Sequence, residues 1–426
     1  MMPASAPPQL QLNRHAIISN IAALFSGSVI AQGLTTLTLL LTARRLGVVN
    51  YGQYAGCFTL TAITAITFNL GMDIWLLREG GRDRTSLGQL VGSSLALKGG
   101  LGLLWFVLVS IIAPLINPSV FPPALVRWSA LATWLDSILA TLLIIYKATL
   151  RNKITFIIQA ASDGLWFIIT LLLFGLGEMQ ATAYVQVRVI ALMLSCGLTA
   201  YLMTRWLPLK PIFTTMKRIV RESLPFAASE LLALAAMRID VLIIAFLLGE
   251  NAVGLYSPAV GLVNAMFLIP ATVYNVIVPV LSNLFVRQPQ QAWLTAKRSL
   301  GLLLVLGVGL TIAVFISAGF FTQILGPSYA NSRVILQLLS LILTLHSLIF
   351  GLVAILVATG QQGKRALVQV ITVAVNIVLN FLLIPRFGVQ GAASVYIITE
   401  IILLVGYGWV AYHYGVCPFL SHSTEN

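Results

Sequence analysis

Long apolar runs alternate with short polar loops along the whole chain. The runs are about 20 to 30 residues long, and a helix needs roughly 20 apolar residues to cross the hydrocarbon core of a bilayer. No loop is long or polar enough to form a soluble domain. The pattern predicts an all-α polytopic membrane protein with about twelve transmembrane helices. They are expected at approximately 18–43, 54–77, 89–115, 124–147, 154–177, 181–205, 223–249, 255–284, 299–323, 333–358, 366–385 and 389–412.

One short motif follows both the first and the seventh apolar run. "LGVVNYGQY" begins at Leu46 and "LGENAVGLY" begins 202 residues later at Leu248, with the leucine, both glycines and the tyrosine at the same spacing. Glycine directly after an apolar helix is typical of a left-handed helix cap, and the second glycine predicts a tight turn into the next helix. The repeated residues are Leu46, Gly47, Gly52 and Tyr54 in one copy, and Leu248, Gly249, Gly254 and Tyr256 in the other.

A second, weaker repeat supports a duplication. An Ala-Thr pair follows the predicted fourth span at Ala148 and the tenth at Ala358, 210 residues apart. Both offsets are close to half the chain, so we expect two six-helix lobes of the same topology, related as parallel repeats around a central cavity. The predicted units are a cytoplasmic tail 1–17, an N-lobe 18–206, a connector 207–222, a C-lobe 223–413 and a cytoplasmic tail 414–426.

The connector has its own pattern. "LPLKPIFTTMKRIVRES" places apolar residues at helical spacing, with Lys210, Lys217, Arg218 and Arg221 between them. This pattern predicts an amphipathic helix that lies on the inner leaflet and contacts anionic lipid.

Composition agrees with a lipid environment. Hydrophobic residues make up 59% of the chain and charged residues 9%, and the mean hydropathy is +0.96. Soluble domains carry about 25% charged residues. The three cysteines and four histidines are scattered, which predicts no disulfide framework, no metal site and no cofactor.

Basic residues indicate the orientation. If the N-terminus is cytoplasmic, 17 of the 25 lysines and arginines lie in inner segments and four in outer segments. The excess predicts that both termini are cytoplasmic. It also explains the net charge of +13 without a nucleic-acid partner, because the charge is spread over separate short loops. The N-terminal segment lacks the short apolar region of a secretory signal, so we interpret it as leading into an uncleaved first helix.

Five stretches together resemble a known family. They are "ARRLGVVNYGQY", "RIDVLIIAFLLGENAVGLYSPA", "VPVLSNL", "LGPSYANSRVILQLLS" and "NFLLIPRFGVQGAASVY". They are similar to bacterial polysaccharide biosynthesis flippases (O-antigen flippase-like) of the multidrug, oligosaccharidyl-lipid and polysaccharide exporter superfamily, from about residue 17 to residue 412. The resemblance implies a MATE-like two-lobed bundle in the bacterial inner membrane. It further implies transport of an undecaprenyl-diphosphate-linked oligosaccharide by alternating access. Whether a polymerase or glycosyltransferase is a partner stays open.

Charged residues inside the predicted spans are the candidate site. Each costs at least about 2.5–3.5 kcal/mol at the bilayer centre, so each should face a cavity or a partner. Arg127 and Arg188 lie close to an outer helix end and could instead reach the interface. For each of these charged residues, the alternative to a role in the cavity is an ion pair with a neighbouring helix. The set is Lys98, Arg127, Arg188, Arg238, Asp136, Asp163, Glu230, Asp240 and Glu400.

The implied substrate suggests roles for this set. A diphosphate needs cations in place of lost water, for which Arg238 is the first candidate, with Lys98, Arg127 and Arg188. The sugars need polar and aromatic walls, such as Asn264 and Asn275, with Tyr274 and Trp105. Asp163, with Asp136, Asp240 and Glu230, could bind a coupling ion or form ion pairs; proton, sodium and membrane potential all stay open.

Two other functions fit parts of the pattern. An ion-coupled multidrug exporter of the same superfamily would share the fold. A membrane polysaccharide polymerase or ligase would also have many spans, but the outer loops carry no pair of carboxylates and no group of histidines. "GQQGK" from Gly360 to Lys364 lacks the upstream glycine and the following Ser/Thr of a phosphate loop, which argues against ATP hydrolysis. We therefore expect a transporter, with no catalytic residues.

Overall fold

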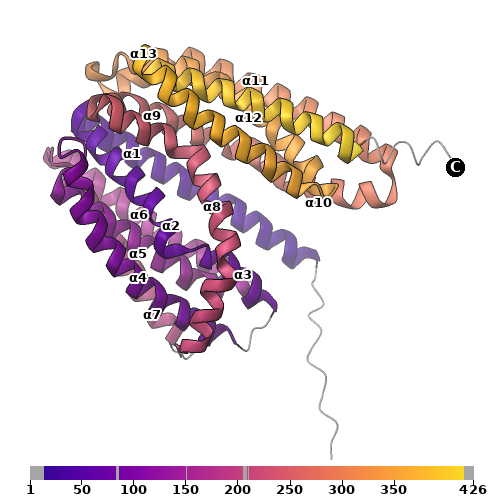
Figure 1. Cartoon of the computed structure of the whole chain (residues 1–426), viewed down its shortest axis with the longest axis horizontal. Helices are drawn as coiled ribbons and strands as arrows, with labels where there is room; N and C mark the ends of the chain where they lie inside the picture. The colour runs from indigo at the N-terminus through magenta and orange to yellow at the C-terminus, as the bar shows by residue number, and fades with distance from the viewer. Residues whose placement is uncertain (1–13, 83–85, 150, 205–208, 210, 417–426) are drawn as a thin grey trace, which may run out of the picture.

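The protein is helical throughout the part of the chain that the structure describes. The structure is a computed structural model that describes residues 14–82, 86–149, 151–204, 209 and 211–416, and no strand occurs in these segments. The helices gather into two groups that differ in their position along the sequence (Figure 1). The predicted all-α fold with two lobes is confirmed.

The helices follow the apolar runs. The N-terminal half forms α1 (Arg14–Thr64), α2 (Ile66–Asn69), α3 (Met72–Arg82), α4 (Leu87–Ile116), α5 (Pro123–Ala148), α6 (Asn152–Leu176) and α7 (Ala181–Thr204). The C-terminal half forms α8 (Phe213–Leu248), α9 (Glu250–Met266), α10 (Leu268–Arg287), α11 (Pro289–Leu325), the 3₁₀ turn η1 (Pro327–Tyr329), α12 (Ser332–Ala358), α13 (Gln362–Val410) and the π-helical turn η2 (Ala411–Val416). α1 begins inside the predicted N-terminal tail.

The number of spans depends on how broken helices are counted. Among the described residues, nine helices are long and apolar enough to cross a membrane, or ten if the bent pair formed by α1–α2 and α3 is one span. Two of the long helices, α1 and α13, contain a residue with non-helical torsion angles, Gly47 and Gly388. These breaks lie just after the predicted ends of the first and eleventh transmembrane spans. The count of twelve stays a prediction.

The first glycine of each repeated motif breaks the helix in the same way. Gly47 has φ 71° and ψ 177°, and Gly249 has φ 80° and ψ −173°. This region is open to glycine and to almost no other residue. The expected positive φ is confirmed, but the chain leaves the helix extended, and ψ is not that of a left-handed cap. The two breaks show that the halves repeat in three dimensions.

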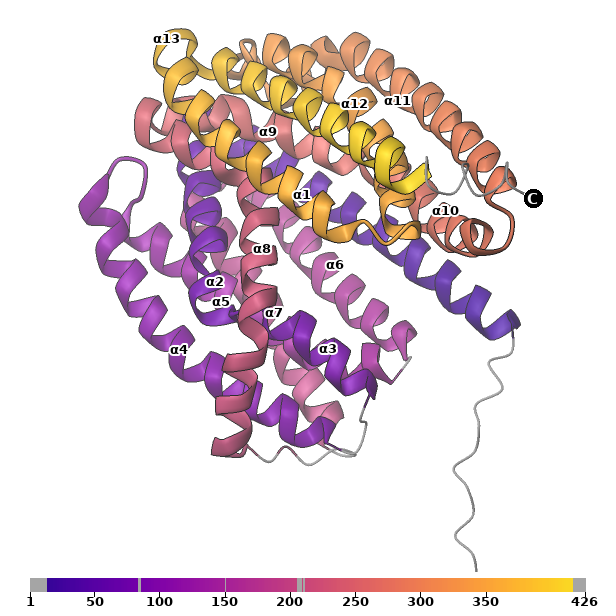
Figure 2. The ribbon, with the colours of Figure 1, turned by 45° about the vertical axis from the view of Figure 1, so that its right-hand side comes forward.

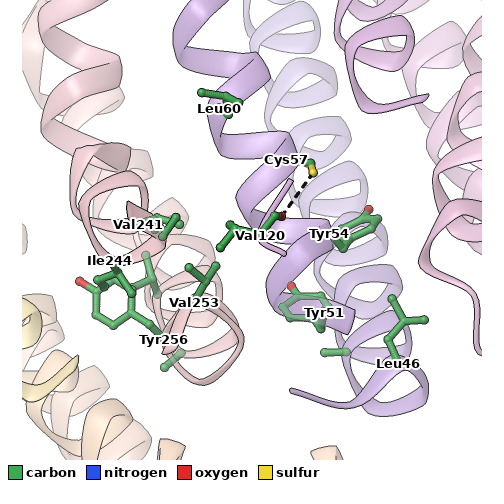
Figure 3. Close-up of a cluster of buried hydrophobic side chains, with 14 of the residues drawn as sticks. Leu46, Tyr51, Tyr54, Cys57, Leu60, Val120, Val241, Ile244, Val253 and Tyr256 are labelled. Atoms are coloured by element: carbon green, nitrogen blue, oxygen red, sulfur yellow. Dashed lines mark hydrogen bonds between the residues drawn. The ribbon is translucent and has the colours of Figure 1, made fainter. Parts of the chain in front are cut away.

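The second glycine of each motif does not form the tight turn that the sequence predicted. Gly52 and Gly254 lie inside α1 and α9, where these two helices cross. A Cβ on Gly52 would overlap the carbonyl oxygen of Glu250, and a Cβ on Gly254 would overlap that of Val48. The two copies of the motif therefore pack on each other, and glycine is required because backbone meets backbone. Figure 3 shows side chains of the two segments, among them Tyr54 and Tyr256.

Polar contacts strengthen the junction between the lobes at this end. The Tyr329 hydroxyl donates a 2.8 Å hydrogen bond to the Ala43 carbonyl, and the Ser119 hydroxyl donates one of 3.2 Å to Glu250. Away from the junction the lobes diverge (Figures 1 and 2), and each has its own smaller apolar core, one around Phe285 and one around Trp75. The junction end holds the lobes together.

Helix α8 belongs to both lobes. Its first part contacts α3 and α4, and its last part packs on α9 and α13. Trp75 and Glu79 of α3 bond to Glu222 and Arg218 of α8 at 3.2 and 2.7 Å. The predicted connector is therefore not a separate helix: from Phe213 it is the start of α8, because the helix continues through Pro225. Residues 207, 208 and Lys210 of the connector lie outside the described residues.

Candidate functional site: a cavity between the lobes

A cavity of about 450 Å³ opens between the lobes. Residues of α1, α5, α6 and α7 line one side, and residues of α8 and α9 line the other. This volume lies within the range of roughly 300–1,000 Å³ that ligand pockets occupy. Four of the residues that the sequence singled out line the cavity together: Asp136, Arg188, Arg238 and Asn264.

Arg238 is the cation of the α8 side. Its side chain is exposed to the cavity, and it has no ion pair and no hydrogen bond with any described residue. Asp240, two residues on, is buried and accepts hydrogen bonds from the Tyr256 hydroxyl and the Val241 amide. The nearby carboxylate is therefore held elsewhere, and the charge of Arg238 faces open space.

Arg188 is the cation of the opposite wall, and it is paired. Its Nη1 lies 2.7 Å from Asp163 Oδ1, and its Nη2 lies 3.2 Å from Asp136 Oδ1. Its guanidinium also lies over the Trp166 ring, 4.6 Å from the centroid, a cation–π contact. Arg188 therefore does not extend to the interface, the alternative that its position in the sequence left open.

Aromatic side chains form part of the α1 wall. Tyr51 and Tyr54 stack with ring centroids 5.7 Å apart, Tyr54 and Phe58 lie 4.8 Å apart, and all three line the cavity. The sequence analysis did not identify this wall, because it assigned Tyr54 to a turn motif. The spacing of 51, 54 and 58 matches one helix face and was the available signal.

Several buried polar atoms in the cavity wall have no hydrogen-bond partner in the described segments. These are the Trp166 Nε1–H, the Ser257 hydroxyl and the Asn264 Oδ1. Buried polar groups are nearly always hydrogen-bonded. An unsatisfied donor and acceptors around one cavity indicate that a polar ligand or water completes them.

Lys98 lies outside this cavity and is fully buried. Its Nζ contacts Asp73 at 2.8 Å and the Ser137 hydroxyl at 2.8 Å, and Thr141 donates to the same Asp73 at 2.7 Å. Ser137 also bonds to Asn69. This network surrounds the bend between α2 and α3, so the structure gives Lys98 a structural partner and no access to the cavity.

The remaining candidates also lie elsewhere. Arg127 is exposed in the first turns of α5, and Asn275 is exposed on α10. Glu230 is half-buried on α8, on the side of Asp73 and Lys98. Of the aromatic candidates, Tyr274 packs on Phe350, and Trp105 packs on Phe68.

The amino-acid sequence also matches a known protein family over more than half of the chain. The model of the family "Polysaccharide biosynthesis protein" matches residues 17–285, more than half of the chain. The chain belongs to the polysaccharide biosynthesis protein family. This confirms the resemblance that the motifs suggested.

This polysaccharide biosynthesis family protein is similar in sequence to a capsular polysaccharide biosynthesis protein and similar in fold to a lipid II flippase. "Capsular polysaccharide biosynthesis protein CapF" of Staphylococcus aureus is 21% identical over 259 residues, which are 58% of this chain and 65% of CapF. The lipid II flippase MurJ in an inward closed conformation superposes with a TM-score of 0.71 at 15% identity, over 93% of this chain and 89% of MurJ.

A multidrug resistance transporter has the same fold. The inward-facing conformation of a MATE family transporter gives a TM-score of 0.71 at 14% identity, over 92% of this chain and 96% of that chain. An outward-facing MATE structure gives 0.61 at 14% identity, over 96% and 97%. At these identities the likeness shows the fold: a MATE-like membrane transporter bundle.

One ion pair between a half-buried histidine and a buried glutamate of this family member was not predicted from the sequence. His346 Nδ1 of α12 lies 2.9 Å from Glu400 Oε2 of α13, and the His346 ring stacks on Phe267 at 4.1 Å. The two residues are 54 positions apart on different helices, so no local pattern links them. The pair does not line the cavity.

Proposed function

We propose that this polysaccharide biosynthesis family protein is a flippase that moves undecaprenyl-diphosphate-linked oligosaccharide units across the bacterial inner membrane, and that it is not an enzyme. The observation that carries the proposal is Arg238, a cation in a cavity between two lobes that has no ion-pair partner among the described residues. The family match, CapF and MurJ support a lipid-linked saccharide as the cargo.

The physical argument concerns the charge of the cargo. A diphosphate that crosses the membrane interior loses its water, and a fixed guanidinium offers charge-assisted hydrogen bonds in return. No donor of Arg238 is bonded to a residue in the described part of the chain, so its donors are available for this purpose. The aromatic wall around Tyr51 and Tyr54, with the unsatisfied Asn264 and Ser257, suits the apolar faces and hydroxyls of sugars.

The way the lobes meet supports alternating access. The excess of basic residues in alternate loops predicts cytoplasmic termini, and with that orientation the junction of Gly52 and Gly254 would close the outer side and the diverging ends would face inward. We propose that cargo enters from the inner leaflet in this state. Opening of the junction and closure of the inner ends would then release it outside, without any chemical change to the cargo.

The test is transport in liposomes that contain an undecaprenyl-diphosphate oligosaccharide, with the rate at which sugar becomes accessible on the opposite leaflet as the readout. Loss of a hydrogen bond to a charged group of about 1.5–3 kcal/mol predicts a roughly 10- to 160-fold slower rate for Arg238→Ala. Arg238→Lys should retain part of the rate because the charge stays.

The matched control is Arg386→Ala, which removes an exposed arginine of α13 that lies outside the cavity. It should transport at the wild-type rate with an equal amount of inserted protein. A wild-type rate for Arg238→Ala would refute the assigned role. Absence of protein-dependent movement for the wild type would refute the flippase.

A second candidate is an ion-coupled exporter of organic cations. It is favoured by Asp136, whose carboxylate lines the cavity and is 59% exposed. The two functions predict opposite ligands. Competition by a prenyl diphosphate supports the flippase, and competition by an organic cation in the same cavity supports the exporter.

A further inference from the structure

The pair of carboxylates on Arg188 adjoins a second, smaller space. Asp136 and Arg188 line both the central cavity and a side pocket of about 90 Å³, and Asp163 lines the side pocket alone. The two ion pairs, at 3.2 and 2.7 Å, therefore form the wall between the two spaces.

The charges of this cluster do not balance. One guanidinium faces two carboxylates, so the wall carries one excess negative charge when both acids are ionised. A diphosphate that approached Arg188 from the cavity would meet this excess charge, and both carboxylates would compete with it for the same N–H donors. Arg188 is a poor anion site in this state.

A polar group inside the side pocket shows that the space is built to hold something polar. Ser162 is 3% exposed and lines the pocket, and its hydroxyl has no partner among the described residues. A water needs about 10–15 Å³ of such space and two or more polar partners. The pocket has room for water beside Ser162 and both carboxylates, which gives a proton a route to them.

We propose that the Asp136–Asp163 pair takes up one proton when an anionic diphosphate binds to Arg188. This inference rests on the proposed function for its ligand. A hydronium in the side pocket gives its proton to one carboxylate oxygen and leaves as water. That carboxyl becomes neutral, its ion pair breaks, and the guanidinium, which keeps all its protons, turns N–H donors toward the phosphate oxygens. One proton thus offsets one negative charge of the site while the anion is bound.

The surrounding groups are compatible with a shared proton on this pair. Tyr54 of α1 interacts electrostatically with Arg188, and Lys98 of α4, paired with Asp73 of α3, interacts with Asp136. From α7 comes Cys196, whose thiol bonds to the Leu135 carbonyl. Across the cavity stands Arg238. Lys98 is already paired with Asp73, and Arg238 forms no ion pair with either acid, so Arg188 is the one described cation paired with them. The proton belongs to the pair and to neither acid alone.

The first experiment measures binding of farnesyl diphosphate to the purified full-length protein between pH 6.5 and 8.5. Uptake of one proton per bound anion predicts a tenfold loss of affinity per pH unit, beyond the titration of the ligand itself. Asp136→Asn removes the excess charge at an exposed position, so it should bind as tightly as the wild type does at low pH and lose this extra dependence. Glu178→Gln, in the loop after α6 and outside the cavity, should keep it.

A second experiment detects the proton without a ligand. Trp166 lies under the Arg188 guanidinium, so its fluorescence should change with pH in the wild type when the ion pair breaks. The change should vanish in Trp166→Phe and in Asp136→Asn. A wild type with no Trp166-dependent change between pH 5 and 9, or with pH-independent farnesyl diphosphate binding, overturns the proton proposal. A Trp166 titration without diphosphate binding at any pH supports the proton site and overturns the proposed function.

Discussion

The contact between the duplicated glycines predicts that one methyl group can change which way the cavity faces. In Gly52→Ala the new Cβ would overlap the Glu250 carbonyl, a backbone atom that cannot rotate away. Overpacking of this kind costs about 1–3 kcal/mol. The cost applies only where the junction is closed, because it disappears when the lobes separate there.

The magnitude follows from this difference between the two states. A cost of about 2 kcal/mol shifts the equilibrium roughly 30-fold toward the state with an open junction. Gly254→Ala, which would overlap Val48, should shift it in the same direction. Because both substitutions open one junction, the double variant should shift less than the sum of the two.

The assay is a distance measurement across the inner ends. Spin labels at Lys153Cys and Gln362Cys, both exposed and on opposite lobes, in a background without the native cysteines, report how far the lobes diverge. Gly52→Ala should enlarge the population with the shorter distance. Gly301→Ala, a helical glycine with open space around it, is the matched control. An unchanged distance distribution in both Gly52→Ala and Gly254→Ala would refute the reasoning.

Two further predictions concern buried polar contacts. Lys98→Met should lower the free energy of unfolding by about 3 kcal/mol, the low end for a broken buried ion pair, because Asp73 is 30% exposed. Adding Asp73→Asn should restore part of this stability. Thermal melting in detergent measures both variants, and an unchanged melting temperature in Lys98→Met would contradict the network. Tyr256→Phe should cost about 1.5–3 kcal/mol by removing the hydroxyl that donates to Asp240, and a melting temperature equal to that of the wild type would show that the bond contributes nothing.

Much of the fold could be predicted from the sequence because the bilayer sets the length of every span. The apolar runs, the short loops and the repeated motif were sufficient for two helical lobes. The breaks at Gly47 and Gly388 each occupy a single residue inside a long helix, which hydropathy cannot resolve. The role of Gly52 was misread because the close approach involves Glu250, 198 positions away in the sequence, and single-sequence patterns carry no such contact.

The sequence could predict which charged residues belong to the candidate site, but it could not predict which of them form ion pairs with each other. The cost of a charge in lipid singled out Arg238, Arg188 and Asp136, and these three meet at the cavity. The same argument also selected Lys98, which the fold pairs with Asp73 instead. Both outcomes satisfy a buried charge, so the rule that finds such residues cannot tell a ligand site from a structural pair.

The duplication explains why the fold was easier to predict than the pairing of the charged residues. The 202-residue offset pairs Tyr256 with Tyr54, but it pairs Asp240 with Thr38 and Arg238 with Thr36. Tyr256 is therefore tied to a carboxylate inside the C-terminal half, while Tyr54 lines the cavity beside Arg188. The glycines recur because both lobes contribute to the same junction, whereas the charges need not recur, because the proposed cargo is asymmetric. If this argument holds, substitutions at the repeated glycines should change how the lobes move, and substitutions at the unrepeated charges should change what they carry.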